Sequence, residues 1–219
     1  MTPAADDLAD LRRMLRSALV ADALDALGHR QQCLPPDIRQ MPPGGVLVGF
    51  AATCRTHPRD AGPDDAYAGL RRVVGSLKAD DVLVIATERS DEYAVWGELL
   101  SIAAASAGAA GTLTDGLVRD VDQVERLGYR TFARGTTPKD VGHRADYGGF
   151  GDPVQIDGVT IRPGDLIVAD VDGAVVVPRE MVDQVVERCL AKVAAEDASR
   201  AAIADGMAPA EAFARFDVL

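Results

Sequence analysis

One short segment combines two residue types that could do chemistry. Arg119-Asp120 follows a predicted strand and turn, where the chain enters a short predicted helix. Ligands of α/β proteins usually bind at such strand ends, so the pair favours a binding site. The alternative is structural, because Asp120 is also a good N-cap and Gln123 would complete a capping box. Arg119 would then be an ordinary surface base.

A second segment, Gly97-Glu98-Leu99-Leu100, opens the preceding predicted helix. The first turn of a helix has free backbone N–H groups and the positive end of the dipole, so it suits a carboxylate. Gly97 would let a ligand approach the backbone closely. The alternative is that Gly97 only starts the helix while Trp96 packs in the core. One helix and one strand separate the two segments, which can bring both to one opening.

The surrounding pattern predicts an α/β fold. Apolar runs predict strands over residues 46–56, 82–86, 111–114 and 130–133. Helical spacing predicts helices over residues 7–27, divided at Ser17, and over 66–76 and 121–127. Val95, Leu99, Ile102 and Ala105 are spaced as one face of a further helix, which ends near residue 107. Residues 29–45 and 59–65 predict a loop and a turn.

The last third of the chain has a different character. Residues 136–153 show no periodicity and predict irregular structure. Asp157-Gly158 and Asp172-Gly173 each separate two apolar runs, which predicts hairpins over 154–161 and 166–177. A helix over 180–204 and a shorter one over 210–215 follow. We therefore expect one domain over residues 1–219, whose residues 180–219 form a helical C-terminal tail.

Composition excludes several classes of function. The 219 residues carry 34 acids against 23 bases, a formal charge of −11, which argues against nucleic acid as a partner. No apolar run approaches about 18 residues, so we expect no membrane span. The N-terminus lacks a signal-peptide pattern, and the three cysteines have no metal-ligand spacing, which together favour a cytoplasmic protein with reduced thiols. Motifs of zinc hydrolases, dithiol redox proteins and Walker-type nucleotide-binding loops do not occur.

The chain resembles the class II pyruvate aldolase family that cleaves 4-hydroxy-4-methyl-2-oxoglutarate, which also includes the regulator of ribonuclease E activity A. The resemblance rests on Gly97 to Leu100, then Arg119-Asp120, then a further acid, Glu125 or the nearer Asp122. It extends over most of the chain, through residues 20–24, 49–53, 132–135, 163–170 and 172–178.

For the fold, the resemblance implies a three-layer β/β/α sandwich like the swivelling phosphohistidine domain. It also implies a homotrimer or homohexamer with active sites between subunits, and a C-terminal tail that contacts a neighbouring subunit.

For the chemistry, the resemblance implies Mg²⁺ or Mn²⁺ bound by Asp120 and water, and a small 2-oxo acid substrate. Arg119 would stabilise a pyruvate enolate, and the backbone amides of Gly97, Glu98, Leu99 and Leu100 would bind the pyruvyl carboxylate. The expected reaction is retro-aldol cleavage of 4-hydroxy-2-oxo acids to pyruvate and a second keto acid. Oxaloacetate decarboxylation would pass through the same enolate.

A second acid is expected from a neighbouring subunit, and Glu196 is our candidate. It falls on the apolar stripe of Val182, Val186, Cys189 and Val193, although it can also be a solvated charge near the helix end, beside Asp197 and Arg200. A role for Glu98 stays open, because a second negative charge beside the carboxylate site is unfavourable unless it faces the metal waters.

The rival interpretation is a non-catalytic regulator that binds protein. The resemblance implies that the regulator branch lacks the acid after the arginine, so Asp120 favours an enzyme.

Overall fold

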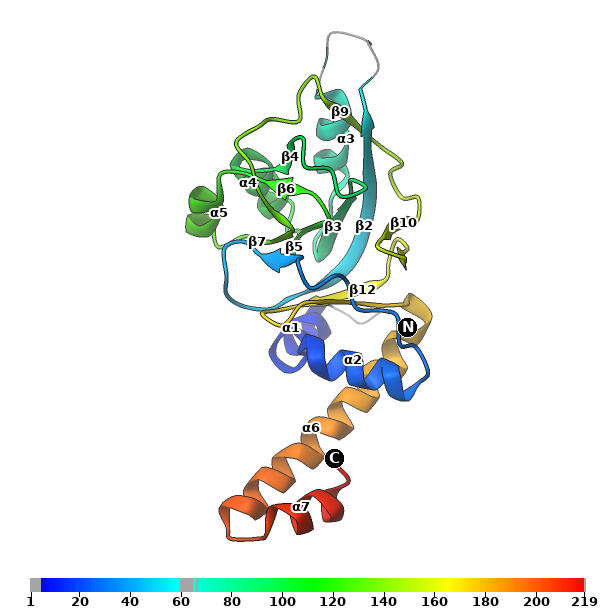
Figure 1. Ribbon diagram of the computed structural model, residues 1–219, viewed down its shortest axis with the longest axis vertical. Coiled ribbons are helices and arrows are strands. Elements are labelled where there is room, and N and C mark those ends of the chain that lie inside the picture. Colours follow the sequence, from blue (N-terminus) through cyan, green and yellow to red (C-terminus); the bar gives the residue numbers. More distant parts are fainter. Residues whose placement is uncertain (1–4, 60–64, 66, 219) are drawn as a thin grey trace.

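A curled eight-stranded sheet forms the centre of the molecule (Figure 1). The computed structural model describes residues 5–59, 65 and 67–218, with side chains from Leu8 onward. The strand order is β1 (Arg39–Gln40), β7 (Arg130–Ala133), β5 (Gly111–Thr114), β3 (Asp81–Ala86), β2 (Leu47–Pro58), β12 (Leu166–Ala169) and β13 (Ala174–Val177), and β9 (Ala145–Gly148) also pairs with β2.

The middle of this sheet is parallel and buried on both faces. Strands β2, β3, β5 and β7 run parallel, while β12 and β9 pair antiparallel with β2. Leu83 and Ile85 of β3 pack with α3 (Ala68–Ser76), α4 (Glu98–Ser106) and α5 (Val121–Leu127). Val82 and Val84 of the same strand face the hairpin of β10 (Val154–Ile156) and β11 (Val159–Ile161). This alternation explains why the strand is apolar throughout.

A second, smaller sheet lies on the helical side. It contains β4 (Ala94–Trp96), β6 (Leu117–Val118) and β8 (Gly135–Thr136), all parallel. Together with the large sheet and the helices it gives the expected β/β/α arrangement, and the predicted fold class is confirmed.

Two helices at the N-terminus and one long helix cover the β12–β13 end of the large sheet. These are α1 (Ala5–Met14), α2 (Ser17–Ala26) and α6 (Val182–Ala204), and α6 is preceded by a 3₁₀ turn at Arg179–Met181. The outer part of α6 leaves the body and α7 (Pro209–Phe216) packs back against it, forming a C-terminal arm (Figure 1). None of the described helices is long and apolar enough to cross a membrane.

Most predicted elements are confirmed, including both Asp-Gly hairpins and the division of the first helix. The turn predicted over 59–65 lies mostly outside the described residues.

Three predictions are wrong. The loop predicted over residues 29–45 contains the two-residue strand β1, which pairs with β7 and is too short to show a pattern. Val95 lies in the buried strand β4 and not in a helix, because α4 begins only after Gly97. The buried face of α4 is instead Ser101 and Ala104, and Leu99 is 77% exposed. The segment 136–153 also contains a strand, β9, which is short and pairs with the distant strand β2, so a local pattern does not show it.

Candidate active site

The small parallel sheet brings the two predicted segments together. Strand β4 leads into Gly97 and α4, and β6 leads into Arg119-Asp120 and α5. The backbone N–H of Arg119 donates to the carbonyl of Trp96 at 2.9 Å. Carboxyl ends of neighbouring parallel strands lie at one edge, so both segments open onto the same space.

The third strand of this sheet, β8, brings a residue that the sequence did not indicate. After β8 the chain returns toward β4, where the carbonyl of Lys139 accepts from the N–H of Ala94 at 2.8 Å. The next residue is Asp140, whose Oδ1 lies 3.1 Å from Nη2 of Arg119. Only recognition of β8 as a third parallel strand would have pointed to this acid.

A pocket of about 590 Å³ lies where these strand ends meet. Glu98, Arg119, Asp120 and Asp140 line its polar end. An apolar wall comes from α3, α4 and the residue after Asp140: Leu70, Val74, Leu100, Ala103 and Val141. The pocket therefore combines a charged end with an apolar side, as small-molecule sites commonly do.

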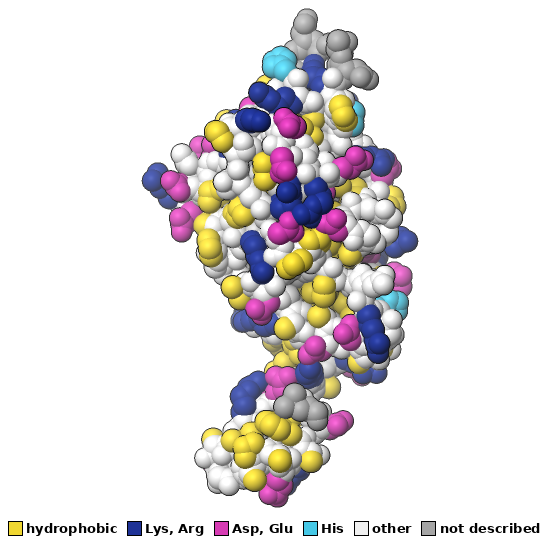
Figure 2. All heavy atoms as spheres, in the orientation of Figure 1, with side chains coloured by type: hydrophobic (Ala, Val, Ile, Leu, Met, Phe, Trp, Pro, Cys, Tyr) yellow, Lys and Arg dark blue, Asp and Glu magenta, His cyan; other side chains and the backbone are white. Residues whose placement is uncertain are grey.

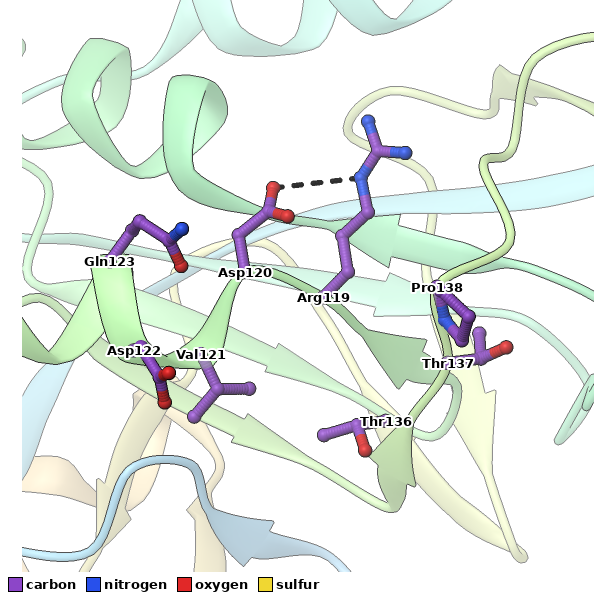
Figure 3. A pocket seen from close by; sticks show the side chains of 8 residues that line it. All are labelled: Arg119, Asp120, Val121, Asp122, Gln123, Thr136, Thr137 and Pro138. Atoms are coloured by element: carbon purple, nitrogen blue, oxygen red, sulfur yellow. Dashed lines mark ion pairs between the residues drawn. The ribbon is translucent and has the colours of Figure 1, made fainter.

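Arg119 and Asp120 point to the same side of their strand end (Figure 3). Nε of Arg119 lies 3.6 Å from Oδ2 of Asp120, and each side chain is 39% exposed. Asp120 has a left-handed backbone, with φ of 58°, and its side chain makes no capping hydrogen bond to α5. The capping alternative for Asp120 is therefore wrong. Its Oδ2 instead accepts from the N–H of Glu98 at 3.3 Å.

Gly97 makes this arrangement possible. A Cβ at this position would lie 2.6 Å from Oδ2 of Asp120 and 3.1 Å from Cγ of Arg119. Distances this short mean that a side chain would push the carboxylate away. Position 97 therefore needs a glycine so that the Asp120 carboxylate can lie against it, whether or not a ligand also approaches the backbone there.

The N-terminus of α4 offers fewer free amides than we expected. The N–H of Glu98 already donates to Asp120. The amides of Leu99 and Leu100 belong to the first helical turn, where no preceding helical carbonyl can accept them. These two, and the N–H of Gly97, which has no acceptor among the described residues, remain available for a bound carboxylate.

The other candidate acids lie in different places. Glu98 is half-buried and lines the pocket, whereas the side chain of Asp122 points away from Asp120 (Figure 3). Asp122 lines a neighbouring hollow of about 500 Å³, which Arg119 and Asp120 also border. Glu125 is exposed on α5 and lines neither space.

Glu196 lies on the C-terminal arm, well away from α4 and α5 (Figure 1). Its Oε2 pairs with Nη2 of Arg200 at 3.2 Å. Within one chain, Glu196 is therefore not part of the pocket.

The hydrogen-bond surroundings of Asp140 keep it ionised. Partial burial alone would raise the pKa of Asp140, but hydrogen bonds from Tyr67 Oη and the N–H of Gly142, together with the Arg119 charge, lower it below its usual value. The same hydrogen bond to Asp140 raises the pKa of Tyr67. Asp140 is thus a stable negative partner for Arg119.

Asp120 suits a cation held by few protein ligands. Among the residues that the structure describes, no group of three or more His, Cys, Asp or Glu side chains is arranged to bind a metal ion. Oδ1 of Asp120 accepts no hydrogen bond from the described residues, and the carboxylate is open to the pocket. Mg²⁺ prefers oxygen ligands and keeps several waters, so one such carboxylate fits it.

Comparison with known proteins identifies a matching family model and several similar proteins. The family model RraA-like, described as Aldolase/RraA, matches residues 17–176. A protein of Halalkalibacterium halodurans named "Putative 4-hydroxy-4-methyl-2-oxoglutarate aldolase" is 29% identical over 97% of this chain and 96% of its own length. The structure of RraAS2 from Streptomyces coelicolor, titled an unusual member of the RNase ES inhibitor RraA protein family, has a TM-score of 0.81 and 30% identity, covering 91% of this chain and 98% of that one.

A longer relative contains a similar region. Protein DlpA of Legionella pneumophila is 32% identical over 87% of this chain, but the matched part is only 30% of DlpA. The chain therefore spans less than a third of that relative.

Proposed function

Since this chain belongs to the RraA-like family, we propose that it is a lyase that cleaves 4-hydroxy-2-oxo acids of the 4-hydroxy-4-methyl-2-oxoglutarate type to pyruvate and a second keto acid. The observation that carries the proposal is the shared pocket of Arg119, Asp120 and the first turn of α4. The same pocket would decarboxylate oxaloacetate, since both reactions leave a pyruvate enolate.

Different groups of the pocket bind the substrate and stabilise the charge that develops during cleavage. The free amides of Leu99 and Leu100 bind the pyruvyl carboxylate. The guanidinium of Arg119 faces the C2 oxygen, where negative charge develops as the C3–C4 bond breaks and its electron pair moves toward that oxygen. A positioned donor of this kind contributes several kcal/mol in a site that excludes water.

Asp120 would hold Mg²⁺ or Mn²⁺, with water in the remaining positions. When bound, the ion acts as a Lewis acid that polarises the substrate carbonyl. The lack of a side chain at Gly97 lets the Asp120 carboxylate lie close to the first turn of α4, so the proposed metal ion and the substrate carboxylate would bind side by side.

The 4-hydroxyl proton needs an acceptor during cleavage. Glu98 lines the pocket and is one candidate to accept this proton, directly or through a water molecule. Glu196 is the other, from the arm of a second copy, since its own chain keeps it away from the pocket.

A regulator that binds another protein is the second candidate function. It is supported by the similarity to RraAS2, which is described as an unusual member of the RNase ES inhibitor RraA protein family. Asp120 and its opening to the pocket support the lyase instead.

A coupled pyruvate assay with lactate dehydrogenase tests the lyase. We expect pyruvate from oxaloacetate and from 4-hydroxy-2-oxo diacids with Mg²⁺ or Mn²⁺, above a blank containing metal alone. Excess chelator should stop the release, and added metal should restore it.

Arg119→Ala should keep the fold but lower pyruvate release by at least about 100-fold, as expected for loss of a charge-stabilising donor. Normal turnover by this variant would remove Arg119 from the mechanism. A wild-type protein that releases no pyruvate from any of these acids would favour the regulator.

A further inference from the structure

Arg119 lies between two carboxylates that contact it differently. Its Nη2 forms an ion pair with Oδ1 of Asp140 at 3.1 Å, whereas its Nε is 3.6 Å from Oδ2 of Asp120. Asp140 is therefore the partner that fixes the guanidinium. Oδ1 of Asp120 accepts no hydrogen bond from the described residues and stays available for a ligand.

The carboxylate of Asp140 is itself fixed by hydrogen bonds to its other oxygen. Its Oδ2 accepts hydrogen bonds from Tyr67 Oη and from the N–H of Gly142, the latter at 3.0 Å. Oδ1 is then left for Arg119. Its side chain is 29% exposed, less than the 39% of Arg119, so the acid is the more enclosed member of the pair.

A second glycine makes room for this arrangement. A Cβ on Gly142 would lie 2.6 Å from Oδ2 of Asp140 and would collide with Tyr67 Oη. Gly97 does the same for Asp120, where the corresponding distance is also 2.6 Å. Each of the two carboxylates beside Arg119 therefore lies in space that a side chain at the neighbouring glycine would occupy.

This geometry answers a problem that a catalytic arginine poses. An arginine side chain has many rotamers, and ordering them costs free energy that must be supplied before or during catalysis. A guanidinium held at one Nη by a fixed carboxylate keeps its other N–H groups pointed in a constant direction. Small errors in such an orientation lower turnover strongly.

We propose that Asp140, held by Tyr67 and Gly142, is a positioning residue that orients the Arg119 guanidinium toward the substrate. The proposal rests on the proposed lyase function. It assigns Asp140 no contact with substrate, because Oδ1 is paired with the Arg119 charge and Oδ2 accepts hydrogen bonds from Tyr67 and the N–H of Gly142.

Steady-state kinetics of Asp140→Asn test the role. We expect kcat to fall about 10- to 100-fold with KM changed less than about threefold, because the lost interaction acts in the transition state. Tyr67→Phe should change kcat in the same direction by a smaller factor. Asp152→Asn removes the acid of the Arg55–Asp152 pair, at 2.8 Å and outside this pocket, and should leave both constants unchanged.

A double-mutant cycle separates positioning from general destabilisation. If Asp140 acts through Arg119, then Arg119→Ala combined with Asp140→Asn should be no slower than Arg119→Ala alone. Multiplied losses in the double variant, or a normal kcat for Asp140→Asn, would overturn the proposal.

A measurement without turnover keeps this inference distinct from the lyase proposal. The NMR order parameter of the Arg119 Nε–H should be high in the wild type and should fall in Asp140→Asn and Tyr67→Phe. Unchanged order in both variants would show that Asp140 does not hold Arg119. An inactive wild type with an ordered Arg119 that loosens in Asp140→Asn would reject the lyase and retain the contact.

Discussion

At the scale of residues, the pocket is organised around one guanidinium between two acids of different character. Asp140 is tied to Tyr67, Gly142 and Arg119, whereas one oxygen of Asp120 is free of described donors. In the proposed mechanism, this difference separates an acid that holds Arg119 from an acid that would bind the metal ion. Asp120 also tolerates its left-handed backbone, because Asp is among the few residues that adopt this conformation at low cost.

The ion pair of Asp140 predicts a pH dependence of stability. Burial opposes ionisation of Asp140, but Tyr67, Gly142 and Arg119 lower its pKa overall, so the folded state favours the carboxylate. The resulting stabilisation is present above the unfolded pKa of about 3.9 and is lost as the pH falls through the lower folded pKa. Wild type should exceed Asp140→Asn by about 1 kcal/mol or less at pH 7.

Urea unfolding of both proteins between pH 7 and pH 2 measures this difference. The gap between them should close at the acidic end. A gap that stays constant over the whole range would contradict the ionised state of Asp140.

At the scale of elements, three short parallel strands position the chemistry. Strands β4, β6 and β8 end beside Gly97, Arg119 and the segment leading to Asp140, respectively. Each strand has only two or three residues, so none has a periodic pattern of its own. Their pairing decides which side chains meet.

Gly97→Ala tests this level directly. The added methyl group would meet Oδ2 of Asp120, so we expect pyruvate release to fall at least about tenfold, since a small displacement of a catalytic group is costly. Circular dichroism should show the wild-type fold. Gly75→Ala is the matched control, because a Cβ there meets nothing within 4 Å. Equal activities of the two variants would show that the Asp120 position does not depend on Gly97.

The features that could be predicted from the sequence are those with a signal in neighbouring residues. Arg119-Asp120 and the Gly97 segment stood out because each follows a strand or opens a helix, and the long buried strands were recognisable from apolar runs. Asp140 and Tyr67 were missed because nothing near either residue signals their contact, which depends on the return of the chain to Ala94. Val95 was misplaced because one apolar residue fits a helical stripe as well as a buried strand.

At the scale of the whole molecule, the described chain leaves apolar surface uncovered. Leu99 and Ile102 of α4 are 77% and 43% exposed, next to the pocket. Apolar side chains also gather on the visible face of the α6–α7 arm (Figure 2). Both features support the proposal of a homotrimer or homohexamer, with Glu196 reaching the pocket of another copy.

Ile102→Glu tests the assembly. A charge on the exposed face of α4 should lower the oligomer mass in light scattering and reduce pyruvate release with it, because a buried unpaired charge is costly. Val171→Glu is the control, since Val171 is 78% exposed on the turn between β12 and β13. An Ile102→Glu protein of unchanged mass would place the subunit contact elsewhere.

The C-terminal arm has a further consequence for local unfolding. The outer half of α6 and α7 pack mainly on each other, whereas β2 is paired along most of its length within the sheet. Amide hydrogens of the arm should therefore exchange with deuterium through small openings of an isolated chain, long before those of β2. If a second copy covers the arm, the arm should be protected from exchange in the oligomer. Dilution below the dissociation constant should then remove this protection, and the exchange rate at the arm would report assembly residue by residue.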